Sequence, residues 1–144
     1  MDATQPISST QVSPSADWFL QTLVNIVNDA DGLELGITLQ VGGGFVSGYL
    51  VGIAKYFEGF ASDFSSAFQG QVSEQIRQEL TNVGKMKPAT ENPDELPLPN
   101  YIHLREARFY HPSGKPMPAN RGIWWRGRVS EVSGFCIGSL TAES

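Results

Sequence analysis

The stretch that decides the fold runs from residue 33 to residue 54 and reads LELGITLQVGGGFVSGYLVGIA. In its first half, large apolar side chains alternate with small or polar ones, and this period of two is typical of a β-strand with one buried face. Gly42-Gly43-Gly44 can adopt the positive φ angles of a tight turn. We therefore predict a β-hairpin whose second strand runs from Phe45 to Ala54, with Gly48 and Gly52 marking a bend or bulge.

Helical periodicity appears on both sides of this hairpin. Before it, between a cap at Ser15 or Asp17 and a stop at Gly32, the apolar stripe consists of Phe19, Leu20, Leu23, Val24, Ile26, Val27 and Ala30. After it, an aromatic stripe consists of Tyr56, Phe60, Phe64 and Phe68, and the pattern continues past Gly70 to Val83. We expect one N-terminal helix and a helical insertion over residues of about 55–83, formed by one kinked helix or two.

The length of 144 residues is that of one domain. Residues 1–15 are rich in Ser, Thr, Gln and Pro and predict a disordered tail, whereas residues 16–144 are expected to form a single globular domain. Residues of about 84–100 hold four prolines among acidic side chains and predict a linker.

The last third of the chain predicts three more strands. The first is Tyr101 to Tyr110, and its slipped apolar phase indicates a bulge near Arg105-Glu106. A loop is expected at 111–118, and the last strands near Gly122 to Ser130 and Gly134 to Leu140. The predicted fold is α+β: a small five-stranded antiparallel barrel, Sm-like or SH3-like, or a bent sheet, with an N-terminal helix and a helical insertion.

The strand that begins after Gly122 carries the strongest candidate for a partner-binding surface. Trp124, Arg126 and Arg128 fall on one face, opposite the face that carries Trp125. An indole flanked by guanidinium groups suits binding better than catalysis. In the helical insertion, further candidates for partner contact are Tyr56, Phe60 and Phe64. The competing interpretation is that Trp124 covers the edge of the core, the arginines are solvated, and the helix aromatics pack on the sheet.

Charge is divided unevenly along the chain. The net charge of −5 combines 4 Lys+Arg against 12 Asp+Glu through Asn100 with 6 Lys+Arg against 3 Asp+Glu from Tyr101 onward. Opposite charge on the two parts permits head-to-tail attraction between copies and predicts salt-sensitive association. The six cations are too dilute for generic nucleic-acid binding. With neither a secretion signal nor a long apolar run, we expect a cytosolic protein with no membrane partner.

Candidates for catalysis are few, and we expect no enzyme. His103, His111 and Cys136 have no nucleophile–base or metal-ligand spacing, so no catalytic, metal or cofactor site is predicted. Gly42-Gly43-Gly44 is not a phosphate loop, since it joins two strands and lacks the Lys-Ser/Thr pair. Cys136 lies in an apolar strand and is expected to be a small buried hydrophobe.

Several sequence blocks resemble the gas vesicle accessory protein GvpU family. In the family's order over residues 33–140, they are Ile37 to Val41, Gly44 to Gly48, Lys55 to Phe57, Ile102 to Arg105, and Trp125 to Phe135. The last block is the most specific, because Trp-Arg-Gly-Arg followed by Glu-Val-Ser-Gly-Phe is not expected from strand propensity alone. The Pro-rich acidic insertion and the basic last third depart from the family, so the role of its charged tail is not carried over.

This resemblance implies a non-catalytic accessory protein that assembles, tethers or clusters gas vesicles, the hollow gas-filled shells used for buoyancy. It would be cytoplasmic and associated with gas vesicles, contact the shell or other gas vesicle accessory proteins, and associate with itself as a homo-oligomer. The alternative is an Sm-like RNA-binding protein or another small oligomeric adaptor, suggested by the helix-then-strands order and by Arg126-Gly127. Against RNA binding, the first hairpin loop holds glycines where Sm proteins carry Asp and Asn.

Overall fold

The structure is a computed structural model that describes residues 16–86, 98–113, 115–118 and 121–140. Its elements are α2 (Trp18–Asp29), β1 (Leu35–Val41), β2 (Gly44–Leu50), α3 (Ile53–Ser65), α4 (Gly70–Val83), β3 (Tyr101–Tyr110), β4 (Pro116–Met117), β5 (Ile123–Arg128), the 3-10 turn η2 (Val129–Glu131) and β6 (Val132–Ile137). The predicted α+β class is confirmed. The predicted tail and positions 87–97 of the predicted linker lie outside the described residues.

The predicted hairpin forms, with shorter strands than expected. β1 and β2 pair in antiparallel register along their whole length. Gly42 and Gly43 have φ angles of 59° and 93°, which a two-residue turn needs if it is to match the right-handed twist of the strands. The prediction that the second strand reaches Ala54 is wrong, because β2 ends at Leu50 and α3 begins at Ile53. A short apolar run fits either type of element, so periodicity does not place this boundary.

In the ranges that the structure describes, six strands form one antiparallel sheet in the order β4-β3-β2-β1-β6, and β5 also pairs with β3. Among the described strands the sheet is not closed, so the predicted five-stranded barrel, Sm-like or SH3-like, is not confirmed. The extra strand is β4, which lies in the predicted loop and pairs Pro116 and Met117 with the end of β3. Two residues carry no detectable period, which is why the sequence did not predict it.

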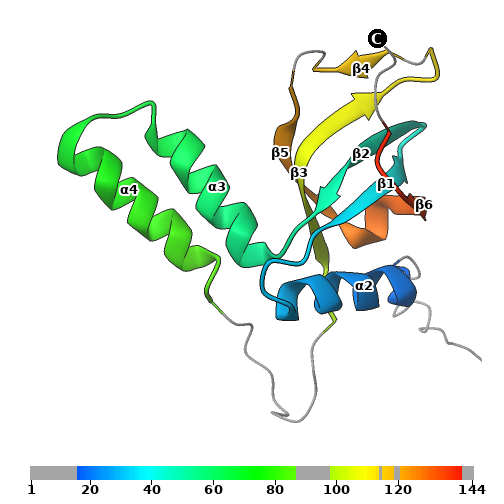
Figure 1. Cartoon of the computed structure of the whole chain (residues 1–144), viewed down its shortest axis with the longest axis horizontal. Helices are drawn as coiled ribbons and strands as arrows, with labels where there is room; N and C mark the ends of the chain where they lie inside the picture. The colour runs from blue at the N-terminus through cyan, green and yellow to red at the C-terminus, as the bar shows by residue number, and fades with distance from the viewer. Residues whose placement is uncertain (1–15, 87–97, 114, 119–120, 141–144) are drawn as a thin grey trace, which may run out of the picture.

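The N-terminal helix packs its predicted stripe on the sheet, as Figure 1 shows for α2 below the strands. Asp17 caps the helix, because its Oδ1 accepts a hydrogen bond from the Phe19 backbone N–H at 2.9 Å. Phe19 and Ile26, predicted to belong to the apolar stripe, are instead half exposed, because the sheet covers a narrower face of the helix. The helix ends at Asp29, before the turn in which Gly32 has a φ of 80°.

The core lies between α2 and one face of the sheet. Each large apolar side chain buried there contributes about 1.5–3 kcal/mol to folding. Its buried members are Leu20, Val24, Val27, Ile37, Leu39, Val46, Leu50, Ile102, Leu104, Ala107, Val129 and Val132.

The bulge predicted in β3 is confirmed. Glu106 has a φ of 54°, and the register of β3 shifts here against both β2 and β5. On β2, a Cβ at Gly48 would lie 2.8 Å from the carbonyl oxygen of Arg105, so a glycine is needed for this close approach of two backbones. Past the bulge, Ala107 still pairs with Ile123 of β5, and the end of β3, at Phe109 and Tyr110, pairs with β4.

The helical insertion is two helices, α3 and α4, which project away from the sheet (Figure 1). Gly70, with a φ of 69°, stands at the start of the second helix. α4 has no buried residue, whereas α3 buries Tyr56, Ala61 and Ser65. The hydroxyl of Ser73 donates a hydrogen bond to the carbonyl oxygen of Ser65 at 2.9 Å. α4 therefore rests on α3, and the contacts of α3 with β3 and β5 orient the pair.

Candidate partner-binding surface

One ionic cluster fixes the base of α3 against the sheet. Glu34, just before β1, accepts hydrogen bonds through Oε1 from Nε and Nη2 of Arg105 at 2.9 and 2.7 Å, and its Oε2 pairs with Lys55 on α3. The Arg105 guanidinium also lies 4.7 Å from the centre of the Tyr49 ring. The hydrogen bonds from Arg105, followed by Lys55, lower the pKa of Glu34, so it is ionised at neutral pH. The cluster ties three separate segments together at the start of the projecting helices.

β5 has the two faces that its sequence predicts. Trp125 packs against the core, and its ring covers Gly127, where a Cβ would lie 2.3 Å from the indole. Trp124, Arg126 and Arg128 alternate with these residues on the opposite face. The strand therefore presents an indole and two guanidinium groups on the side away from the core.

The aromatic stripe that begins on α3 and ends just beyond it, at Phe68, is a continuous ladder of rings. Tyr56, Phe60, Phe64 and Phe68 follow at intervals of four residues, with successive ring centres 5.8, 5.9 and 5.7 Å apart. Tyr56 is buried, Phe60 is half-buried, and Phe64 is 47% exposed. Of the predicted contact residues on this helix, Phe60 and Phe64 are accessible to a partner, whereas Tyr56 supports the sheet end of the ladder.

Trp124 joins this ladder to β5. Its ring lies edge-on to Tyr56, with ring centres 6.0 Å apart. A Cβ at Gly59 would come within 2.0 Å of the indole, so this glycine makes room on α3 for the tryptophan. Beside this contact, between α3 and β5, lies an open groove of about 290 Å³. It is lined by Phe60, Asp63, Phe64, Ile123 and Trp124. Sequence reasoning missed Gly59, although a glycine inside a helical pattern was a usable signal.

Arg126 is held in place by neutral groups. Its guanidinium carbon lies 3.8 Å from the centre of the Tyr101 ring, and its Nε donates a hydrogen bond to Nε2 of His103 at 3.1 Å. Within the described part of the chain it makes no ion pair. The side chain is exposed, and its Nη1 and Nη2 groups have no hydrogen-bond partner there. The protein thus presents a positioned cation with donors available to an anion.

His103 is the residue that positions this arginine. It is 2% exposed, and its ring lies 4.6 Å from that of Tyr56 and 5.9 Å from that of Phe57. Burial, followed by the charge of Arg126, lowers the pKa of His103 to about 3. The imidazole is therefore neutral, with Nε2 as acceptor and the proton assigned to Nδ1. Sequence reasoning missed this role, since only the strand register places His103 opposite Arg126.

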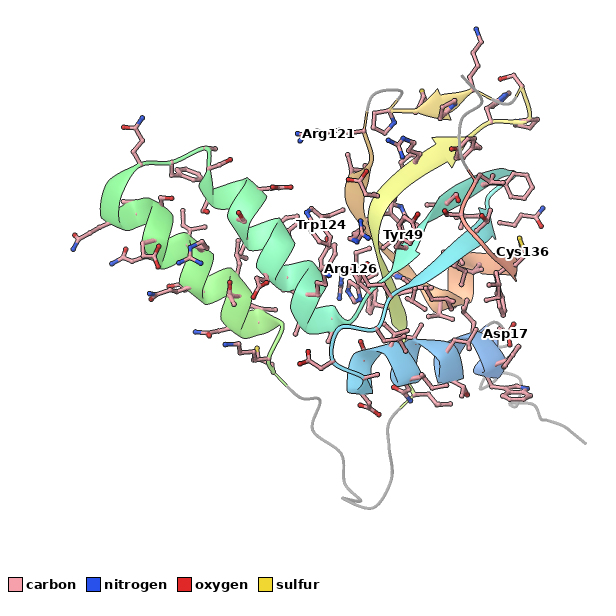
Figure 2. The ribbon with its side chains drawn as sticks, in the orientation of Figure 1. Asp17, Tyr49, Arg121, Trp124, Arg126 and Cys136 are labelled. Carbon is pink, nitrogen blue, oxygen red and sulfur yellow. The ribbon has the colours of Figure 1, made fainter. Side chains whose placement is uncertain are left out.

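The accessible part of this region is named here the aromatic–arginine surface, and it consists of Phe60, Phe64, Ile123, Trp124 and Arg126. Figure 2 shows Trp124 and Arg126 between α3 and the sheet, across the molecule from Cys136. Arg128 continues the same face of β5 opposite Tyr101, and it is exposed with no ion pair to any described residue. The structure thus brings the predicted tryptophan, arginines and helix aromatics into one region.

The predicted burial of Cys136 is wrong, because this free thiol is exposed. β6 is an end strand of the sheet, and Cys136 lies opposite Thr38, whereas its neighbour Phe135 is the residue that packs against the core. In the described ranges, no three His, Cys, Asp or Glu residues gather where they could hold a metal ion. No helix in the same ranges is long and apolar enough to cross a membrane.

Fold and surface together define a small α+β protein with an open antiparallel sheet, a projecting helical hairpin and an exposed aromatic–arginine surface between them. The chain belongs to the gas vesicle protein GvpU-like family, whose model matches residues 17–140. The match confirms the resemblance seen in the sequence and extends it over α2. It identifies a gas vesicle-related protein. Comparison with curated proteins and with solved structures gave no significant match.

Proposed function

We propose that the chain is a non-catalytic gas vesicle accessory protein that helps to assemble, tether or cluster the vesicles. In this proposal it is cytoplasmic and associated with gas vesicles, contacts their shell or another accessory protein through the aromatic–arginine surface, and associates with itself. Membership of the GvpU-like family supports the link with gas vesicles. The geometry supports a contact function at this surface.

The observation that carries the proposal is the state of Arg126. A guanidinium stacked on one ring and hydrogen-bonded to a neutral imidazole has already lost much of its rotamer freedom, so binding an anion costs little further entropy. Arginine also binds carboxylates through paired N–H donors. The exposed apolar side chains of Phe64 and Ile123 lie in the same region. The surface thus suits a partner that presents a carboxylate beside an apolar side chain.

The test is co-sedimentation of the purified chain with intact gas vesicles across a salt series, followed by light scattering. Arg126→Glu with Arg128→Glu reverses two charges on β5 and should weaken binding about tenfold or more. Arg126→Gln with Arg128→Gln removes the charges without adding repulsion and should give a smaller loss. The matched control is Lys85→Glu with Lys115→Glu, which changes net charge equally at two exposed positions that belong to neither α3 nor β5.

Binding that weakens with salt and with the arginine variants, but not with the lysine control, supports the proposal. If the arginine and the lysine charge reversals weaken binding equally, the effect is one of overall charge. The aromatic–arginine surface would then no longer be assigned as the binding site. Absence of association at any salt would overturn contact with the shell. Circular dichroism of each variant shows whether the helix and sheet content is kept.

A further inference from the structure

The last strand, β6, has one edge without a strand partner in the described chain. Of the described strands, β6 pairs with β1 alone. The backbone N–H of Gly138 donates to the carbonyl of Gly36 at 2.7 Å, so in the antiparallel alternation Cys136, which lies opposite Thr38, also directs its backbone groups toward β1. Phe135 and Ile137 therefore direct their N–H and C=O groups outward, at the free edge of the sheet.

This edge lacks the usual protection against pairing. Exposed edge strands of soluble proteins commonly carry charged side chains or proline, but Val132–Ile137 reads VSGFCI and has neither. The register irregularity against β1 lies at Val41, and the strand is regular from Gly134 onward. Such an edge can accept another uncharged strand without repulsion between side chains.

An apolar patch continues from this edge onto α2. Ile137 is 60% exposed and Trp18 is 70% exposed, whereas the ring of Phe135 lies 5.9 Å from that of Phe19. Trp18 and Phe19 are also in ring contact at 5.9 Å. Phe135 and Ile137 share one face of the sheet, the face that α2 covers. A strand added here would gain backbone hydrogen bonds and apolar contact from the same side.

We propose that β6 pairs with β6 of a second copy, in antiparallel orientation about a two-fold axis at Cys136. In this register the outward residues pair with one another: Phe135 of one copy lies opposite Ile137 of the other, and each such pair exchanges both of its N–H···O bonds. An aromatic side chain opposite a β-branched one is a favourable cross-strand pair. The two-fold axis keeps both α2 helices on one side, so the Trp18 and Phe19 rings of the two copies extend a common apolar face.

The same register predicts where the free cysteine lies in the dimer. Cys136 lies opposite Cys136 of the second copy in a non-hydrogen-bonded pair, where the Cα atoms are about 4.5 Å apart. That distance lies within the roughly 4.4–6.8 Å found in disulfides. The cysteine is thus a reporter of the register; backbone pairing, not the thiol, forms the interface.

This inference rests on the self-association part of the proposed function, and its test needs no gas vesicles. Failure of β6 pairing would leave contact through the aromatic–arginine surface intact, because that surface lies on the other side of the molecule (Figure 2). Conversely, a dimer that does not bind vesicles would keep β6 pairing and overturn the proposed contact. The two failures are therefore distinguishable.

The experiment measures the mass of the full chain by sedimentation equilibrium, for the wild type and three variants. The wild type should give a concentration-dependent dimer of twice the 15.7 kDa chain mass. Ile137→Pro removes an outward N–H without breaking the β1 ladder, and Ile137→Lys places a charge at the edge; each should weaken the dimer about tenfold or more. Met117→Lys changes an equally exposed apolar side chain on β4 and should leave the dimer unchanged.

Crosslinking tests the register without altering the interface. Diamide, which takes up two electrons and two protons as two thiols join, should convert the wild type to a disulfide dimer. The control combines Cys136→Ser with Ser133→Cys and moves the thiol along the same strand; it should crosslink at least about tenfold more slowly, since residue 133 would face residue 139. A monomeric wild type, an assembly insensitive to both Ile137 variants, or equal crosslinking of the control would overturn the proposal.

Discussion

The buried imidazole under Arg126 predicts a large and assignable pH dependence of stability. The pKa of His103 is about 3 in the folded chain, against 6.5 for an unperturbed histidine. The unfolded chain therefore binds the proton more tightly than the folded chain. The contribution of His103 to the free energy of unfolding is thus fully present above about pH 6.5 and is lost as the pH falls toward 3. From these two pKa values, His103 alone should reduce the free energy of unfolding by about 2.5 kcal/mol between pH values of about 7 and 4.5.

The variant that isolates this effect is His103→Gln. Its amide oxygen can accept the hydrogen bond from Arg126, and its side chain does not titrate. Guanidinium unfolding of both proteins at the two pH values gives four free energies. Carboxylates such as Glu34 titrate in both proteins and cancel in the difference. The wild type should lose about 2.5 kcal/mol more than the variant; a loss equal within about 0.5 kcal/mol would refute the argument that His103 is buried neutral beneath the arginine.

Gly59→Ala should destabilise the fold by about 1–3 kcal/mol despite its higher helix propensity, because the added Cβ displaces the Trp124 indole. Near-ultraviolet circular dichroism and urea unfolding check this, and an unchanged tryptophan signal with higher stability would contradict it. Glu34→Gln should lower the free energy of unfolding by about 1 kcal/mol at neutral pH by releasing Arg105 and Lys55. Because the pKa of Glu34 is lowered from 4.5, its contribution is present above 4.5 and is lost as the pH falls through the folded pKa. The deficit should therefore fade in acid, and a deficit of constant size would argue against the ion cluster.

Local patterns predicted much of the secondary structure. The two-residue period and the glycines gave the β1–β2 hairpin, and the slipped phase of β3 gave the bulge at Glu106. The end of the second strand was predicted wrongly at Ala54, because an apolar run there suits either a strand or a helix. β4 escaped prediction because its pairing with the end of β3 depends on a partner strand and not on its own composition.

The candidate site also contains residues that the sequence predicts and residues that only the structure reveals. Its exposed members were predicted from alternation on β5 and from helical spacing on α3. The groups that hold them, His103 beneath Arg126 and Gly59 beneath Trp124, depend on strand register and on where α3 meets the sheet. The exposure of Cys136 likewise follows from β6 being an end strand.

The sequence by itself determined the α+β class, the hairpin, the helices, the two faces of β5 and the resemblance to the GvpU family, because each of these depends on residues close together along the chain. Only the tertiary structure decided that the sheet stays open, that β6 ends it with an uncharged edge, and that α3 meets β5 through Trp124. These features depend on contacts between segments tens of residues apart, whose geometry no local periodicity encodes.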